Sequence, residues 1–181
     1  RITGEAKDDI RKLELLMNQA EITIEDRKVV GAALAKEKVT GHPAAAIELP
    51  DGTLVTGKTG DLLGPSAAMI LNALKTLAGI DDEIDLIAPD YITPIQTLKT
   101  DYLGSNNPNL HMDEILIALS SSAGTNEVAA EAIRQLPKLR GCDAHSTVIL
   151  SAADTGTYRR LGIQLTCEPR YEEEDRLYHK L

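Results

Sequence analysis

Between Lys58 and Ser66 the sequence gathers cationic and hydroxyl side chains around glycines, a combination that could bind an anion. The letters from Gly52 to Thr59 match the phosphate-loop pattern G-x-x-x-x-G-K-T. That loop requires a glycine-rich turn between its first Gly and its Lys, followed directly by a helix. Here the interval is rich in β-branched residues, and Pro65 delays any helix. The pattern therefore predicts a strand rather than a triphosphate-binding loop.

The helix expected to begin at Pro65 is a better candidate anion site. Its free N–H groups and positive dipole end would lie beside lysine and hydroxyl side chains. Ligands in open α/β sheets also tend to sit beyond strand ends, which adds residues from later loops. The candidate ligand-binding residues are Lys58, Thr59, Gly64, Ser66, Asp90, Thr93 and His111. The alternative is that residues 60–66 form only a tight turn before a helix.

Residue types that could bind a metal or transfer protons occur in two further places. Cys142 and His145 lie three positions apart in a predicted strand, so they point to opposite faces and would not converge on one ion. In the run from His111 to Glu114, the carboxylates suit a helix start without any catalytic role. A general acid–base role for His111 stays open. No metal or cofactor is predicted, and no catalytic residue is assigned.

The composition restricts the class of partner. The formal charge of −9 with no Lys/Arg stripe argues against nucleic acid as a partner. With two cysteines, no apolar run approaching twenty residues and no signal peptide, we expect a soluble, cytoplasmic protein that does not enter a membrane. The chain starts at Arg1 without Met, and we expect it to be a fragment of a longer protein.

The N-terminal 41 residues are expected to form a helical hairpin. Apolar residues recur every three or four positions within residues 5–20, and Thr23 can cap a second helix that ends near Gly41. Neither helix carries a His, a Cys or a glycine loop. We therefore expect the pair to be buried against the α/β domain or another subunit, and the protein to be a homo-oligomer.

Residues 42–170 are expected to form one α/β domain, followed by a charged tail at 171–181. A strand hairpin centred on Gly52 precedes the helix from Pro65, either Thr125 or Asn126 is expected to open a later helix, and Ser151 is a predicted helix cap. The predicted strands are Ala44–Leu49, Thr53–Thr59, Ile84–Ala88, Cys142–Leu150 and Ile163–Cys167. This order predicts a mixed sheet of about five strands with helices on both faces.

Several stretches resemble uncharacterised protein family 0371, a bacterial family containing a domain of unknown function. The similar stretches are Pro43–Gly52, Thr56–Thr59, Gly141–His145, Lys7–Met17 and Cys167–Glu172. The resemblance covers nearly the whole chain and corresponds to the C-terminal part of a longer protein. It implies contacts with the missing N-terminal part, and it implies no activity.

The predicted order of elements is also similar to the cytidine-deaminase-like fold. Zinc deaminases carry H/C-x-E at the helix after the hairpin and P-C-x-x-C after the next strand. The corresponding positions here are Gly64–Ser66 and Pro89–Thr93, which lack the ligands. The sequence thus predicts a metal-free domain that binds a small anionic or nucleotide-like ligand within a larger bacterial protein. The alternative is a structural or oligomerisation module without a ligand.

Overall fold

The structure is a computed structural model, and it describes residues 7–171 of the 181-residue chain. The first six residues and all of the expected tail except Tyr171 lie outside the described residues. The helices are α1 (Lys7–Gln19), α2 (Lys28–Thr40), α3 (Pro65–Ala78), α4 (Pro89–Thr97), α5 (Met112–Ser122), α6 (Glu127–Ile133) and α7 (Ala152–Leu161). The strands are β1 (Ala44–Glu48), β2 (Leu54–Lys58), β3 (Asp143–Ser146) and β4 (Gln164–Cys167). Short helical segments span Ile24–Asp26, Leu98–Tyr102 and Leu136–Leu139.

The described strands form one open mixed sheet in the order β2-β1-β3-β4. β1 runs antiparallel to both of its neighbours, and β3 runs parallel to β4. As a result, β2, β3 and β4 all point in the same direction. The carboxyl ends of these three strands therefore meet at one edge of the sheet.

The sheet has four strands rather than the expected five, because the segment predicted as a strand at Ile84–Ala88 is irregular. The side chain of Asp81 accepts the N–H of Glu83 at 2.9 Å, and the Asp81 carbonyl accepts the N–H of Ile84 at 3.1 Å. This local turn uses backbone groups that a strand would need for pairing. Leu86 and Ile87 are buried in the core without joining the sheet.

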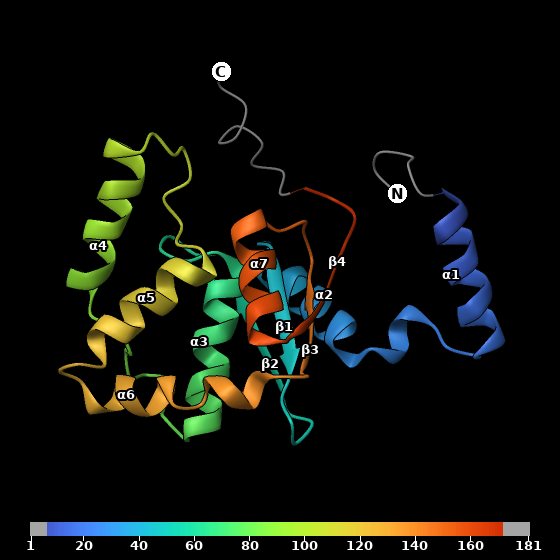
Figure 1. The fold of residues 1–181 in the computed structure, drawn as a ribbon, viewed down its shortest axis with the longest axis horizontal. Helices are drawn as coiled ribbons and strands as arrows, with labels where there is room; N and C mark the ends of the chain where they lie inside the picture. Colours follow the sequence, from blue (N-terminus) through green and yellow to red (C-terminus); the bar gives the residue numbers. More distant parts are fainter. Residues whose placement is uncertain (1–6, 172–181) are drawn as a thin grey trace.

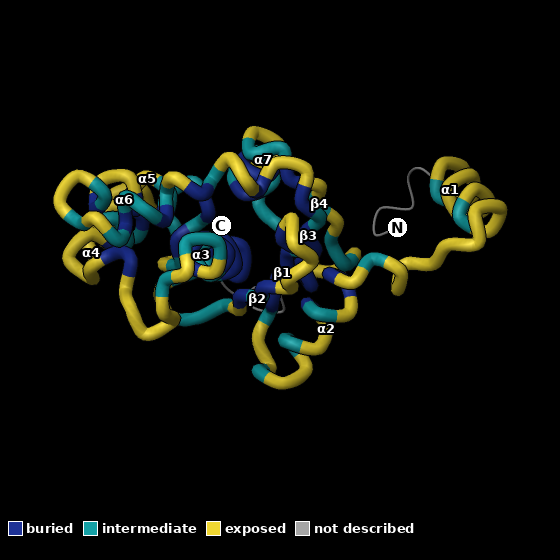
Figure 2. The backbone as a smooth tube through the Cα atoms, turned by 90° about the horizontal axis from the view of Figure 1, so that it is seen from below, coloured by how far each residue is buried: buried dark blue, intermediate teal, exposed yellow. Residues whose placement is uncertain are grey.

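Helices cover both faces of the sheet, as the alternation in β1 requires. Ala46 packs with Val29 and Ala33 of α2, whereas Ala45 and Ile47 belong to the main core on the opposite face. α3 contacts β2 and β1 on that second face. Figure 2 shows α2 and α3 on opposite sides of the strands.

Most helix termini follow the sequence signals, but Thr23, expected to cap the second helix, precedes the short segment Ile24–Asp26 instead, and α2 begins after Arg27. Pro65 is the first residue of α3, and Gly79 ends that helix with φ 67°. The side chain of Asn126 caps α6, and that of Ser151 caps α7 by accepting the N–H of Asp154. Residues with these caps start or stop helices because they satisfy backbone groups that the helix itself leaves unpaired.

The expected helical hairpin at residues 1–41 differs from the structure, where α1 and α2 do not pack together. α2 packs against β1, β2 and β3, whereas α1 has no buried residue. Figure 1 shows α1 standing apart from the rest of the molecule. The physical reason is that α2 packs against the small alanine side chains of β1, which form a flat surface. The larger leucines of α1 do not form such a surface and stay exposed. The domain boundary near residue 41 stays a prediction.

The remaining helices form a second layer. α5 and α6 pack on α3, and α4 contacts α5 on the side away from the sheet (Figure 1).

No helix in the described part of the chain is long and apolar enough to cross a bilayer. The cytidine-deaminase-like topology also stays a prediction.

Candidate functional site

Two cavities lie at the edge where β2, β3 and β4 end. In open α/β sheets, ligands bind outside the carboxyl ends of the strands. Lys58 is the last residue of β2 and lines the larger cavity, and the residues from Val148 to Ser151, which follow β3, line the smaller one. The fold therefore brings the ends of distant strands to one place.

The larger cavity has a volume of about 480 Å³. Lys58 and Thr59 line it from the sheet, and Asn107 and Asn109 line it from the polar loop before α5. The acidic side chain of Asp61 also lines it. Its walls thus combine one ammonium group, one carboxylate, and hydroxyl and amide groups that can donate hydrogen bonds.

The smaller cavity, of about 60 Å³, shares Asn107 and Asn109 with the larger one. Gly64 lines it at the start of α3, and His111 and Asp154 line it from α5 and α7. The shared asparagines make the two cavities neighbours.

Backbone hydrogen bonds hold the two loops of this region together. Leu63 and Leu110 form an isolated parallel bridge. The Gly64 N–H donates to the Leu110 carbonyl at 3.2 Å, and the Leu110 N–H donates to the Leu62 carbonyl at 2.9 Å. Residues before α3 and residues before α5 therefore form one rigid frame around the smaller cavity.

His111 and Asp154 form the central polar contact of the smaller cavity. Nδ1 of His111 lies 3.1 Å from Oδ2 of Asp154, whose Oδ1 accepts the N–H of Met112 at 2.8 Å. Ser151 donates to Oδ2 at 3.0 Å. An ionised carboxylate only accepts hydrogen bonds, so the imidazole donates from Nδ1. Within the described chain no residue forms a hydrogen bond with Nε2, which is left for a molecule in the cavity.

The electrostatics of this pair favour an ionised carboxylate and a basic imidazole. The hydrogen bond to Asp154 raises the pKa of His111 above its ordinary value, against an opposing effect of burial. Burial raises the pKa of Asp154, but hydrogen bonds from His111 and Met112 outweigh it, so the net pKa lies below the ordinary value. The Asp154 side chain is 9% exposed and that of His111 is 23% exposed. Asp154 thus stays charged and stabilises the imidazolium.

A buried ion pair fixes the backbone of His111. Glu114 accepts the His111 N–H at 2.7 Å and pairs with Lys99 at 2.9 Å. Lys99 is 7% exposed and also donates to the Asn109 carbonyl at 2.6 Å. The loop that lines both cavities is therefore tied to α5 and to the π-helical turn at Leu98–Tyr102.

Three of the predicted site residues do not join the cavities. Ser66 is buried, and its Oγ accepts a hydrogen bond from Tyr158 at 3.1 Å. Asp90 and Thr93 are exposed on α4, which packs against α5. Lys58 and Thr59 line the larger cavity, and Gly64 and His111 line the smaller one. The structure brings together four of the seven candidates.

Sequence reasoning missed Ser151 and Asp154 as site residues. Ser151 was predicted only as a helix cap, and nothing in the sequence connects Asp154 with His111, 43 positions earlier. Asn107 and Asn109 were not considered as site residues. An acidic residue three positions after a helix cap was the available signal, but only the fold shows what it faces.

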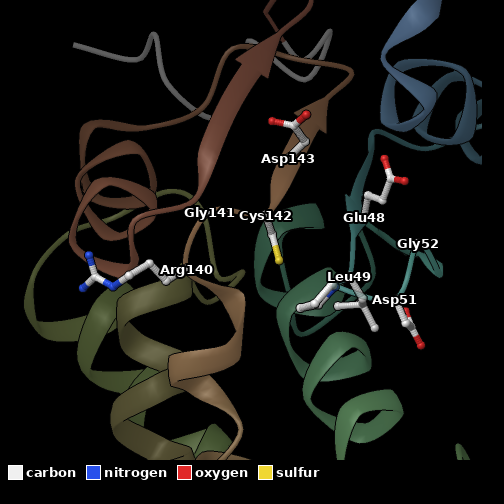
Figure 3. A pocket seen from close by; sticks show the side chains of 9 residues that line it. Glu48, Leu49, Asp51, Gly52, Arg140, Gly141, Cys142 and Asp143 are labelled. Carbon is white, nitrogen blue, oxygen red and sulfur yellow. The ribbon is translucent and has the colours of Figure 1, made fainter.

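A further cavity, of about 570 Å³, lies at the opposite edge of the sheet. Figure 3 shows Cys142 and Leu49 in its centre, with the carboxylates of Glu48 and Asp143 above them. Burial raises the pKa of the Cys142 thiol, which disfavours the reactive thiolate. Because this edge holds the amino ends of β2 and β3, we prefer the two cavities at the other edge as the candidate site.

The described residues contain no cluster of three or more His, Cys, Asp or Glu side chains that could hold a metal ion. His145 is buried, with Nδ1 2.8 Å from Oγ1 of Thr166, and burial lowers its pKa. Cys142 and Cys167 are both free thiols.

Comparison with known proteins identifies relatives over most of the chain. A family model described as "Domain of unknown function DUF1846, C-terminal" matches residues 25–178. A UPF0371 protein of Corynebacterium glutamicum (strain R) is 54% identical over 178 residues, which is 97% of this chain and 36% of the relative. A UPF0371 protein of Streptococcus thermophilus (strain CNRZ 1066) is 53% identical over 171 residues, 94% of this chain and 34% of the relative. The chain thus spans about a third of the length of these relatives.

Proposed function

The chain belongs to the UPF0371 family through its DUF1846 C-terminal domain, and we propose that this domain binds a small anionic molecule at the carboxyl edge of its sheet. The proposal rests on one observation. Of two neighbouring cavities at this edge, one is lined by Lys58 and the other by His111, whose Nδ1 is held by Asp154 and whose Nε2 has no hydrogen-bond partner among the described residues.

The charge distribution supports an anion rather than a cation as the ligand. The whole chain carries a formal charge of −9, whereas Lys58 and His111 offer cationic donors at these cavities beside the carboxylates of Asp61 and Asp154. Lys58 is exposed, and its Nζ lies 3.4 Å from the Thr59 carbonyl. A flexible ammonium of this kind can approach a phosphate or carboxylate as a point charge.

Substitution of Lys58 tests the proposed function, with pyrophosphate as the probe. Isothermal titration should show saturable binding to the intact chain, and Lys58→Ala should weaken it by roughly tenfold or more, because a charge-assisted hydrogen bond contributes about 1.5–3 kcal/mol. The matched control is Lys12→Ala, which removes the same charge from exposed helix α1. Failure of the intact chain to bind, or equal weakening by both variants, would contradict the proposal.

A second candidate function, assembly with another copy of the chain, is favoured by α1. Leu13 and Leu16 of this helix are 59% and 60% exposed, and no residue of α1 is buried. The α/β body does not cover the apolar stripe of α1 that contains Leu13 and Leu16.

A further inference from the structure

We propose that the two cavities are subsites of one site for a molecule with two anionic groups, one bound by Lys58 and the other by Nε2–H of a protonated His111. This inference rests on the proposed function and specifies its ligand class. It also implies that binding above the pKa of His111 takes up a proton, because the neutral imidazole offers a lone pair at Nε2 where the anion needs a donor.

The size of the smaller cavity supports this division. At about 60 Å³ it has room for a compact group and not for a whole metabolite, whereas its neighbour of about 480 Å³ can hold the remainder. Asn107 and Asn109 line both cavities. A ligand that crosses from one to the other would therefore pass side-chain amides that can donate hydrogen bonds along its length.

The groups around His111 favour its charged form. Asp154 of α7 contacts Nδ1 directly, and the hydroxyl of Ser151 shares the same carboxylate oxygen. Glu114 of α5 and Lys99 of the π-helical turn form an ion pair with each other at 2.9 Å. Their opposite charges largely offset, so the Asp154 carboxylate dominates and stabilises a positive ring.

Asp61 sets a condition on the ligand. Its carboxylate lines the larger cavity and opposes an anion there. A single anionic group would meet Lys58 and Asp61 together, which are close to neutral as a pair. A second anionic group at His111 adds a charge-assisted hydrogen bond from Nε2–H, although the Asp154 carboxylate on the other side of the ring offsets part of its charge. The site should therefore prefer a bis-anion to a mono-anion.

Sulfonates test the inference, because their charge does not change near neutral pH. Binding of methanesulfonate, ethanedisulfonate and propanedisulfonate would be measured by isothermal titration between about pH 6 and pH 8.5. The better disulfonate should bind at least about tenfold more tightly than methanesulfonate at about pH 6, as expected for two linked contacts. Its affinity should then fall by up to about tenfold per pH unit above the pKa of His111.

Two histidine variants identify the titrating group. His111→Gln keeps a polar side chain but cannot be protonated, so it should abolish both the pH dependence and the preference for a disulfonate. His42→Gln removes the exposed histidine that lines the larger cavity; whatever its effect on the affinity itself, the pH dependence and the preference for a disulfonate should persist in this variant. Titrations in two buffers with different ionisation enthalpies should show proton uptake in the intact chain and in His42→Gln only.

The outcomes separate this inference from the proposed function. Absence of binding by any sulfonate and by pyrophosphate would overturn both. Binding that is independent of pH, equal for mono- and disulfonates, or unaffected by His111→Gln would overturn the bis-anion site and leave anion binding at Lys58 in place. Loss of proton uptake in His42→Gln but not in His111→Gln would also overturn it.

Discussion

Among single residues, Asp154 has two roles: it caps the start of α5 and it contacts the imidazole ring of His111. One of its oxygens accepts the N–H of Met112 at the start of α5, and the other contacts the His111 ring and the Ser151 hydroxyl. A carboxylate with three donors remains ionised, since each hydrogen bond stabilises the charged form. The same contacts that stabilise a helix start therefore set the protonation state of the candidate site.

The stability of the chain should depend on His111 in a defined pH window. The pKa of His111 is raised in the folded state by Asp154, so its contribution to the free energy of unfolding is complete below the unfolded value of 6.5 and is lost as pH rises through the folded value. The free energy of unfolding of the intact chain should exceed that of the His111→Gln variant by roughly 1–2 kcal/mol at about pH 5.5, and the difference should be smaller at about pH 8. Urea unfolding at both pH values measures this. A difference that grows with pH would contradict the assignment.

The sequence predicts residues that act locally better than residues that act across the fold. Lys58 and Gly64 lie beside cavities because a strand end and a helix start determine their positions, and their role as ligand-binding residues stays a prediction. Ser66 follows the same helix start but points into the core toward Tyr158. Sequence spacing cannot predict that contact, because Tyr158 is 92 positions away.

At the scale of elements, the close approach of β2 and α3 positions the candidate site. Gly57 lies in β2 next to Lys58, and a Cβ at this position would lie 2.1 Å from the backbone nitrogen of Met69 in α3. The glycine of the apparent phosphate-loop pattern thus serves packing: it lets a helix approach the strand. The strand prediction for residues 53–59 is confirmed over Leu54–Lys58.

Alanine at Gly57 should separate these two elements. Gly57→Ala is expected to lower the free energy of unfolding by about 3 kcal/mol, because the helix backbone must move to admit a methyl group. Gly60→Ala provides the control, since no atom lies within 4 Å of its added Cβ and its φ is not positive. That variant should stay within about 0.5 kcal/mol of the intact chain. Equal stability of the two variants in urea unfolding would contradict this account of β2 and α3.

Elements with explicit start and stop residues were predictable, and elements that depend on tertiary partners were not. Pro65, Asn126 and Ser151 begin helices as expected, because their effect is local. The segment 84–88 was predicted as a strand from its apolar residues, but the acidic turn before it satisfies its backbone instead. Apolar residues thus indicated that this segment is buried, but they did not indicate which backbone conformation it adopts.

At the scale of the whole molecule, the described chain divides into a packed α/β body and one helix outside it. α2 was predicted to pair with α1, yet it covers a face of the sheet and leaves α1 without a partner in the described residues. The chain also spans about a third of its relatives' length. Contact of α1 with another polypeptide segment, such as the longer relatives contain outside the matched region, is therefore the main alternative to pairing between copies.

Substitutions on opposite sides of α1 can decide whether copies of this chain assemble. At 3.6 residues per turn, Leu13 and Leu16 share a stripe with Ile10 and Met17, whereas Leu15 lies on the opposite side. Leu15 is 54% exposed, which is close to the exposed fractions of Leu13 and Leu16. A lysine at position 15 therefore enters a similarly exposed environment but lies on the side of the helix opposite the stripe. The Leu13→Lys/Leu16→Lys variant should reduce a dimer to monomer in light scattering, and Leu15→Lys should not. A monomeric intact chain would instead favour a different polypeptide segment as the partner of α1, because a stripe this apolar would then have no copy of itself to bury it.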